Sequence, residues 1–493
     1  MKTVPVPAPR GLHLTLAGAL ALAGGCAVGP DYHKPTAEAA PAAYQEGTNT
    51  WKVAVPQAHL AKGAWWELYG DVELNQLERD ALAANQSLQA TVAAFDQARA
   101  VLDLAKSGLY PRLALAPTIT RERDSANRPI NGVSNGKPDT YNTFNVPLDL
   151  SYEVDVFGRV RRTVEAARAA GEAGAADVET TKLALGAEVA RDYFTLRALD
   201  TEMALLRSNV EVFEKSLDLT RHRRAGGVAT DLDVSQAETI LRTTQAQLPV
   251  IALHRRQAEH ALAVLTGRPA PGFQLAERTL AIPAPQVAAG VPSELLERRP
   301  DIAAAERRMA AANANVGVAK AAFYPSLKLF GVAGFQSVSA ASLFDWPSRV
   351  WSVGPALNLP VFLGGQNRAQ LRQNEAAYRL VTANYRQTVL TAFGEVEDNL
   401  AAQTLLAAEA AAQDAAVRSA RKTLEIASNR YRAGLVTYLE VATAQSAALD
   451  LERAAVHLHG DQLVTSVALI KSLGGGWTNA PAAAAAAAKP GKP

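Results

Sequence analysis

The chain alternates between two hydrophobic patterns, one with the period of an α-helix and one with the period of a β-strand. In the helical tracts apolar residues recur at spacings of three and four, which is typical of a coiled-coil seam. This spacing occurs at Leu206, Val210, Phe213 and Leu217, and at Val441, Ala444, Ala448, Leu451, Ala455 and Leu458. The chain has 26 prolines but none in residues 148–248 or 361–480, so we predict very long helices there. An ordinary helical bundle is the alternative interpretation.

The strand pattern occurs once in each half of the chain. Apolar and polar residues alternate over residues 144–156 and again over 351–361, and weaker segments precede them at 113–119 and 327–335. A strand that crosses a membrane needs about 9–11 residues with one apolar and one polar face. Aromatic residues gather near the ends of these segments, as they do at membrane–water boundaries. They are Tyr141, Phe144, Phe344, Trp346 and Trp351. We predict four membrane strands; two soluble hairpins packed on the helices are the alternative.

The two halves of the chain resemble each other. Residues 227–238 align without a gap to residues 434–445, with identities at Gly, Thr, Leu, Val and Ala positions. Three further matches occur in the same order: Leu109-Tyr-Pro-Arg-Leu113 with Phe323-Tyr-Pro-Ser-Leu327, Val156-Phe-Gly158 with Val361-Phe-Leu-Gly364, and Leu265-Thr-Gly267 with Leu473-Gly-Gly475. These collinear matches indicate a tandem duplication.

Each repeat has the same predicted order of elements. A helix (71–108 or 299–322) precedes two strands, a helical tract of about 65 residues, a turn and a returning helix of about 35 residues. At about 1.5 Å per residue, the long tract spans about 100 Å. Glycine at each turn permits the left-handed conformation that ends a helix, and Thr230 and Thr437 are the expected N-caps of the returning helices. Each repeat therefore carries an antiparallel helical hairpin.

The N-terminus has the pattern of an export signal. Lys2 and Arg10 precede an apolar run at 11–23, which is too short for a transmembrane helix of a mature protein. The run ends in Leu22-Ala23-Gly24-Gly25-Cys26, which resembles a bacterial lipobox. We expect Cys26 to be the first mature residue, with S-diacylglycerol and N-palmitoyl groups that anchor it in a membrane. In the lipoproteins that this segment resembles, alanine at the next position favours the outer membrane. An incidental cysteine within a signal peptide is the alternative.

Composition excludes several classes of protein. The charges, 50 Lys+Arg against 48 Asp+Glu, nearly balance, which argues against a nucleic-acid partner. A mean hydropathy of −0.04 excludes a polytopic helical membrane protein. One cysteine excludes a disulfide framework and a cysteine-based metal cluster. The sequence has no zinc-protease, nucleotide-binding or hydrolase motif, and its histidines are poorly spaced to share a metal. We therefore expect neither an enzyme nor a cofactor or metal site.

Four strands cannot close a barrel by themselves. Lipid excludes open sheet edges, and membrane barrels begin at about eight strands, so several chains must combine their hairpins. Three chains that contribute twelve strands are the smallest cyclic arrangement that comfortably leaves a pore. The segments 124–139 and 337–345 are rich in Asn, Gly and Ser and are the expected external loops.

Several motifs together resemble one known family. They are Cys26-Ala-Val-Gly-Pro-Asp-Tyr32, Trp65-Trp66 with Leu74, Glu297-Arg-Arg-Pro-Asp301-Ile302, Phe323-Tyr-Pro325-Ser and the two Ala-Gly turns. From Cys26 to about Trp477 the sequence is similar to bacterial outer-membrane efflux factors, the TolC-like family, and most of all to its OprM/NodT lipoprotein branch. The resemblance implies an α+β membrane protein. In that fold a homotrimeric twelve-stranded β-barrel, with four strands per chain, continues into a periplasmic α-helical barrel of coiled-coil hairpins.

The resemblance also implies partners and a domain organisation. A periplasmic adaptor (a membrane fusion protein) and an inner-membrane RND-type pump dock at the helical tips, and outer-membrane lipid surrounds the barrel. The expected segments are a lipoprotein signal peptide (1–25), an anchor and equatorial segment (26–70), a first repeat (71–267, with hairpins 112–156 and 158–267), an equatorial linker (268–298), a second repeat (299–475, with hairpins 326–361 and 364–473) and a disordered tail (476–493). The implied location is the outer membrane, with extension into the periplasm.

The implied functional residues lie at the two hairpin tips. The adaptor-docking turns are Arg224, Ala225, Gly226, Gly227, Arg432, Ala433 and Gly434. The periplasmic gate candidates are Tyr431, Leu439, Glu440, Asp233 and Asp231. A ring of carboxylates around an axis raises the pKa of each member and attracts cations. A second acidic position of the family falls on Thr443 here, which leaves the strength of such a ring open. A solvated coiled-coil face is the alternative, and Asp231 fits an exposed turn residue better than a gate.

These features predict a passive exit duct of a tripartite efflux system, which receives its substrates from the pump and adaptor. A structural coiled-coil protein of the cell envelope and a soluble helical enzyme are the two alternatives. The first predicts a filled helical seam without conductance, and the second needs an active site that the sequence does not contain. The sequence does not identify the cargo.

Overall fold

The computed structural model describes residues 27–34, 63–127, 140–285 and 299–475, with the backbone of 129–130 and 133–134. The signal peptide, Cys26, most of the N-terminal segment, the end of the linker and the tail lie outside these residues. The chain divides into two compact units, which we describe separately. We call the unit of Met1–Pro35, Asp96–Ala173 and Ala305–Asn384 the sheet unit, and that of Thr36–Phe95, Gly174–Ala304 and Tyr385–Pro493 the helical unit.

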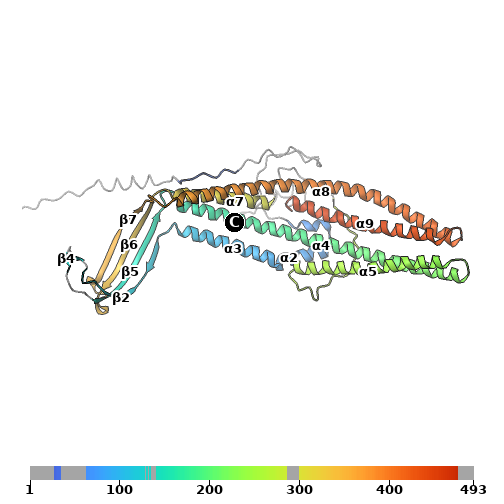
Figure 1. Ribbon diagram of the computed structural model, residues 1–493, viewed down its shortest axis with the longest axis horizontal. Coiled ribbons are helices and arrows are strands. Elements are labelled where there is room, and N and C mark those ends of the chain that lie inside the picture. Colours follow the sequence, from blue (N-terminus) through green and yellow to red (C-terminus); the bar gives the residue numbers. More distant parts are fainter. Residues whose placement is uncertain are drawn as a thin grey trace, which may run out of the picture. The chain divides into compact units, whose positions relative to one another are not determined.

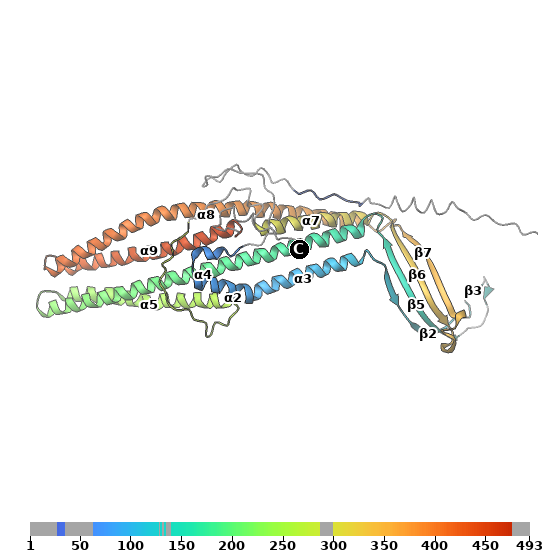
Figure 2. The same cartoon turned by 180° about the vertical axis from the view of Figure 1, so that it is seen from behind.

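The sheet unit contains one antiparallel sheet that both repeats build (Figure 2). The first repeat supplies β1 (Arg112–Leu115), β2 (Thr118–Arg123) and β5 (Thr140–Val154). The second supplies β6 (Ser326–Ser337) and β7 (Arg349–Asn358). β1 and β2 both pair with β5 in one continuous register and act as a single strand interrupted at Pro117, which has no amide to donate. The order is thus β1/β2, β5, β6, β7, with four strand positions as predicted.

The register assigns every residue of the sheet to one of two faces, because directly paired residues of antiparallel strands point to the same side. Phe144, Leu148 and Leu150 share one face with Leu113 and Ile119. Across β6 and β7 this face continues with Leu327, Leu329, Ala333, Phe335, Trp351, Val353 and Leu357. The opposite face carries Arg112, Asn145, Asp149, Ser151, Glu153, Lys328, Gln336 and Asn358. The predicted alternation is therefore present over most of the sheet, with Phe330, Val332 and Val350 as apolar exceptions on the polar face.

The expected hairpin limits need two corrections. The last strand ends at Asn358 rather than at residue 361, because Pro360 cannot donate to a ladder. The segment 124–139 is not wholly loop, since β3 (Pro129–Ile130) pairs with β4 (Val133–Ser134); the rest of it lies largely outside the described residues. Segment 337–345 contains the 3-10 helix η3 (Ala340–Ser342), and η4 (Trp346–Ser348) follows it.

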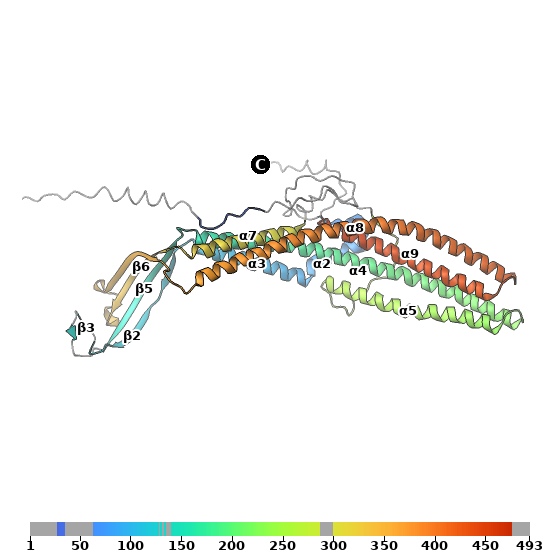
Figure 3. The ribbon, with the colours of Figure 1, turned by 45° about the horizontal axis from the view of Figure 1, so that its top comes forward.

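The helical unit is built around two long hairpins that lie side by side (Figures 1 and 3). α4 (Arg159–Ala225) and α8 (Gln366–Arg432) each have 67 residues, and each enters this unit from the sheet unit. The returning helices α5 (Asp231–Leu265) and α9 (Tyr438–Ser472) each have 35 residues and contact each other. Equal lengths in the two repeats agree with the predicted duplication. No helix in the described ranges is both long and apolar enough to cross a membrane.

The helix expected over 71–108 is in fact two helices, α2 (Val72–Ala84) and α3 (Gln86–Ser107). Asn85 separates them with extended backbone angles. Its side-chain oxygen accepts the amide of Leu88 at 3.0 Å, and its side-chain nitrogen donates to the carbonyl of Leu265 at 2.9 Å. Asn85 therefore caps α3 and ties it to the end of α5. The corresponding helix of the second repeat, α7 (Pro300–Ala321), is continuous.

The core of the helical unit lies where the short 3-10 helix η1 (Trp65–Tyr69) and α2 pack on α4 and α9. Its members include Trp65, Trp66, Leu74, Leu77, Tyr193, Phe194, Leu463 and Val467. Glu78 is fully buried among these apolar residues, and neither of its carboxyl oxygens has a hydrogen-bond partner in the described residues. A side-chain carbon added at Gly186 would lie 3.0 Å from one of these oxygens, so a larger residue there would press on the carboxyl group.

Candidate functional site at the hairpin tips

Both hairpin tips end their long helix with the same backbone turn. Gly227 and Gly434 each have φ of 74°, in the left-handed region that favours glycine. The amide of Val228 donates to the carbonyl of Arg223 at 2.8 Å, and the amide of Leu435 donates to the carbonyl of Arg430 at 2.9 Å. These equivalent bonds satisfy carbonyls that the helix leaves open. The predicted glycine turns are thus present.

The two returning helices begin differently. Thr230 and Asp233 form a reciprocal capping box at the start of α5, with bonds of 2.8 and 3.2 Å. Burial opposes ionisation of Asp233, but hydrogen bonds from Thr230 and the nearby positive charge of Arg223 hold the pKa of this carboxyl below its usual range. Thr437 occupies the N-cap position of α9 but makes no side-chain cap bond. The acid of the second repeat, Glu440, is therefore not used in a cap.

Arg223 connects the tip of the first hairpin to that of the second. Its guanidinium donates to the carbonyl of Arg432 at 3.1 Å and lies over the ring of Tyr431, 4.7 Å from the centroid. The Tyr431 ring also packs edge-on against Tyr438, with centroids 5.4 Å apart. Tyr431 is buried and its hydroxyl has no partner in the described residues. The guanidinium of one repeat thus holds an aromatic pair of the other.

Two further contacts join α4 to α9 behind the tips. Ser216 and the Tyr438 hydroxyl lie 3.2 Å apart, and Tyr438 donates to the side-chain oxygen of Gln445 at 3.1 Å. Burial raises the pKa of Tyr438. Farther from the turns, the buried carboxylate of Glu202 on α4 forms an ion pair with Arg453 of α9 at 2.7 Å. The first repeat is therefore fastened to the second repeat at three levels.

The remaining gate candidates are exposed. Leu439 and its counterpart in the first repeat, Leu232, are 56% and 66% exposed. The Glu440 carboxylate is half-exposed and lies 3.9 Å from Arg430. Asp231 forms an ion pair with Arg224 across the turn, as expected of an exposed turn residue. The Thr443 hydroxyl donates to the carbonyl of Leu439 at 2.9 Å.

Sequence reasoning did not identify Arg223, Tyr438, Ser216 or Gln445. One signal was present, because the repeat alignment puts Tyr438 opposite Asp231. An aromatic residue in the first position of a helix, where the other repeat has an acid, indicates a contact outside the hairpin. Arg223 had no such signal, since it is one of four consecutive basic residues, with Arg221, His222 and Arg224.

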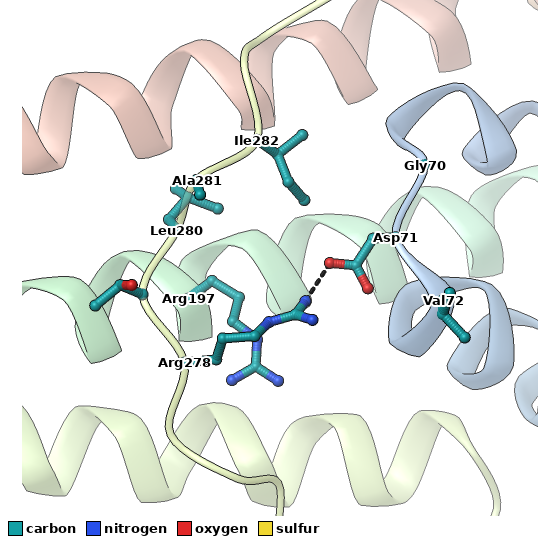
Figure 4. Close-up of a pocket in the computed structure, with 9 residues that line it drawn as sticks. Gly70, Asp71, Val72, Arg197, Arg278, Leu280, Ala281 and Ile282 are labelled. Carbon is teal, nitrogen blue, oxygen red and sulfur yellow. Dashed lines mark hydrogen bonds and ion pairs between the residues drawn. The ribbon is translucent and has the colours of Figure 1, made fainter.

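A pocket of about 500 Å³ lies elsewhere in the helical unit, between the start of α2, α4 and the extended segment 278–282 (Figure 4). Asp71, Arg197 and Arg278 converge in it. Arg278 is paired with Asp71, and the buried Arg197 is paired with Glu73 at 2.5 Å and Asp200 at 2.6 Å. Because internal carboxylates neutralise these guanidinium groups, the pocket has no surplus charge with which to bind a ligand.

The same charged network fixes the extended segment after α5. The amide of Leu275 donates to Glu259 at 2.9 Å, and the amide of Arg278 donates to Asp200 at 3.1 Å. Arg197 donates to the carbonyl of Ala276 at 2.7 Å. Side chains therefore provide the hydrogen-bond partners that the backbone of this segment would otherwise find in a neighbouring strand. The equatorial role expected of segment 268–298 stays a prediction.

The described residues begin in the sheet unit at Ala27, directly after Cys26. A side-chain carbon added at Gly158, the residue before α4, would lie 2.7 Å from the Ala27 Cα atom. The amide of Val28 donates to the carbonyl of Phe157 at 3.0 Å, and Asp31 pairs with the buried Arg162 at 2.7 Å. These contacts hold the segment 27–31 against the connection between β5 and α4.

Comparisons with known proteins agree with this architecture. Residues 77–268 and 291–475 match the Outer membrane efflux protein family. Outer membrane protein OprJ of Pseudomonas aeruginosa is 35% identical over 460 residues, which cover 92% of this chain and 94% of OprJ. The toluene efflux pump outer membrane protein TtgF of Pseudomonas putida is 33% identical over 95% of this chain and 97% of TtgF. The solved structure of the outer-membrane channel OprN has a TM-score of 0.84 at 30% identity and covers 92% of this chain and all of that one.

The family match falls in two ranges, one for each repeat, and the structural likeness includes both the strands and the long hairpins. The fold is that of the TolC-like outer-membrane channels. The chain belongs to the outer membrane efflux protein family and is the outer-membrane component of an efflux pump.

Proposed function

We propose that three copies of the chain form a closed duct, which gives substrates a passive path from the periplasm to the outside. The observation that carries this proposal is the sheet. Its edges, β1/β2 and β7, each pair on one side only in the described part of the chain. The four strand positions alternate in direction, so β7 of one copy is antiparallel to β1/β2 of the next. Closure puts the apolar face on lipid and the polar face in the lumen.

The mass of the purified protein in detergent tests this proposal. We expect three chains per particle, because one chain leaves strand edges open to lipid and two chains supply only eight strands, whose closed barrel is too narrow for a duct. We also expect the particle to resist dissociation by mild detergent, since each seam adds a ladder of backbone hydrogen bonds. A stable monomer that inserts in membranes would contradict the proposal.

The hairpin tips are the proposed periplasmic gate and docking site. In a ring of three copies, the exposed Leu439 and Glu440 face the axis, and Arg223 restrains the second hairpin through Tyr431 and the Arg432 carbonyl. Val228 and Leu435 occupy equivalent turn positions and are 67% and 70% exposed, which suits an apolar contact with a periplasmic adaptor. An inner-membrane RND-type pump supplies the energy. TtgF is named for toluene, but the cargo of this chain is set by that pump in our proposal.

The lipid anchor on Cys26 is also a proposal. Ala27 lies against Gly158, just beyond the end of β5 where the proposed barrel ends, and this position supports an anchor on the preceding residue. We expect labelled palmitate to be incorporated into wild-type protein and not into Cys26→Ser, because the serine hydroxyl is not a substrate for the same thioether chemistry. Ala27→Ser is the matched control and keeps the label. Equal labelling of Cys26→Ser would contradict the anchor.

A further inference from the structure

Three arginines stand out on the apolar face of the sheet. Arg121 and Arg123 lie two and four residues after Ile119 on β2, so their side chains point to the same face as Ile119. Arg349 on β7 is paired with Phe335. All three arginines therefore lie on the face that we assign to lipid. All three are exposed. The Arg349 guanidinium lies over the Trp346 ring and donates to the Trp346 carbonyl at 2.7 Å. The structure gives none of them an ion pair with a described residue.

Nearby acids do not account for these charges. Glu122 alternates with the two β2 arginines and points to the polar face, where its carboxylate accepts the Thr120 hydroxyl at 3.0 Å. Asp124 and Asp345 lie in the connections beyond the strand ends. Within the described residues, the lipid-facing arginines of both sheet edges therefore have no acidic partner.

The arginines mark one boundary of the apolar band. On β7 the apolar face continues from Arg349 through Trp351 to Leu357, and on β2 and β1 it continues from Arg121 through Ile119 to Leu113. Each path spans eight residue steps, or about 26 Å along the strand at about 3.3 Å per residue. Strands of membrane barrels tilt by about 40°, so this length rises about 20 Å along the membrane normal, of the same order as the apolar band of about 25 Å. On both edges of the sheet, arginine therefore lies at the loop end of the apolar face, eight steps from its other end.

These arginines occur at one end of the band only. The other end of this face carries Leu113, Val154, Leu327 and Leu357 and has no basic residue in the described strands, whereas Arg112 and Lys328 there point to the polar face. General snorkelling of basic residues to an interface would favour both ends. Positive charge at the loop end alone, away from the helices, indicates a partner confined to the external leaflet.

We propose that these arginines bind the phosphate groups of lipopolysaccharide, the phosphorylated glycolipid of the external leaflet. Guanidinium groups suit this chemistry, because they bind phosphate oxygens through two parallel hydrogen bonds. The inference rests on the proposed trimer, since β2 and β7 are opposite edges of one sheet and become neighbours only across the seam between two copies. Each seam then combines Arg349 of one copy with Arg121 and Arg123 of the next. Three equivalent sites result, each of which joins two copies through one lipid.

The test is lipid binding to the purified protein in detergent, measured by native mass spectrometry. The probes are lipid A with both phosphates, dephosphorylated lipid A and phosphatidylglycerol. We expect wild type to bind phosphorylated lipid A in preference to the other two. The triple variant Arg121→Gln, Arg123→Gln, Arg349→Gln should bind it roughly tenfold to a hundredfold more weakly. The corresponding triple lysine variant keeps the charge and should retain an intermediate affinity.

The matched control is Arg112→Gln with Lys328→Gln, which removes positive charge from the polar face of the same sheet. This control should bind lipid A as wild type does. Equal binding by wild type and the triple glutamine variant would overturn the inference, as would equal binding of phosphatidylglycerol. The same spectra report the number of chains, so failure to form a trimer is distinguishable: that result contradicts the proposed duct, whereas a trimer without lipid preference contradicts only the lipid site.

Discussion

Replacing Arg223 with alanine is expected to shift the duct strongly toward its open state. The substitution removes a charged hydrogen bond to the Arg432 carbonyl and a cation–π contact with Tyr431, and both contacts join the two hairpins at their tips. For a half-buried side chain, these contacts together contribute about 1–2 kcal/mol per chain. If three chains open together, the sum is about 3–6 kcal/mol, or a change of roughly 10²–10⁴ in the open–closed equilibrium. Single-channel recording in a planar bilayer measures the change.

Arg221→Ala is the matched control for this experiment. Arg221 lies on the same helix, is more exposed than Arg223 and pairs with Glu238 of the same hairpin at 3.8 Å. It therefore restrains nothing between the two repeats, and its loss should leave the conductance unchanged. An intact Arg223→Ala trimer with wild-type conductance would remove Arg223 from the gate.

Replacing Glu78 with glutamine is expected to remove much of the pH dependence of folding. Burial without a partner raises the pKa of the Glu78 carboxyl to about 9, from an ordinary value of 4.5. Between these values the folded state keeps the proton and the unfolded state loses it, so stability decreases as pH rises through this window. From pH 5 to pH 8 the loss is about 4 kcal/mol at about 1.4 kcal/mol per pH unit. Denaturant unfolding at several pH values measures it.

The control for Glu78→Gln is Glu188→Gln, at a half-exposed carboxylate on α4. We expect this control to keep the wild-type slope of stability against pH. Glu78→Leu should be more stable than wild type at pH 8, because it places an apolar group in an apolar site. A Glu78→Gln protein with an unchanged slope would show that the carboxyl group is not held neutral in the fold.

The sequence was sufficient for those features that depend on local periodicity. The alternation over 144–156 determines which face of β5 is apolar, and the proline-free tracts with their glycine turns determine the two hairpins. The break at Asn85 was missed, because its side chain acts on the carbonyl of Leu265, far away in the sequence. The burial of Glu78 could not be predicted for the same reason, since Gly186, far away in the sequence, lies beside its carboxyl group.

The candidate gate was predicted only in part. The family resemblance led to Tyr431, which lies in the contact between the repeats, and to Asp233, whose carboxylate closes a capping box instead. Glu440 occupies the equivalent position in the second repeat but has no capping role. Its carboxylate is therefore available for other contacts, whereas that of Asp233 is held in the cap. The repeats are alike in backbone and differ in the side chains that join them, and only packing reveals that difference.

The most direct test of the gated duct is the conductance of the purified wild-type protein in a planar bilayer, compared with Glu440→Gln. Our account predicts a small conductance that prefers cations, because the proposed trimer places the half-exposed Glu440 carboxylates around its aperture. It predicts a weaker cation preference in the variant. A trimer that inserts in the bilayer and conducts no ions, even after Arg223→Ala, would contradict the duct and favour a structural coiled-coil protein.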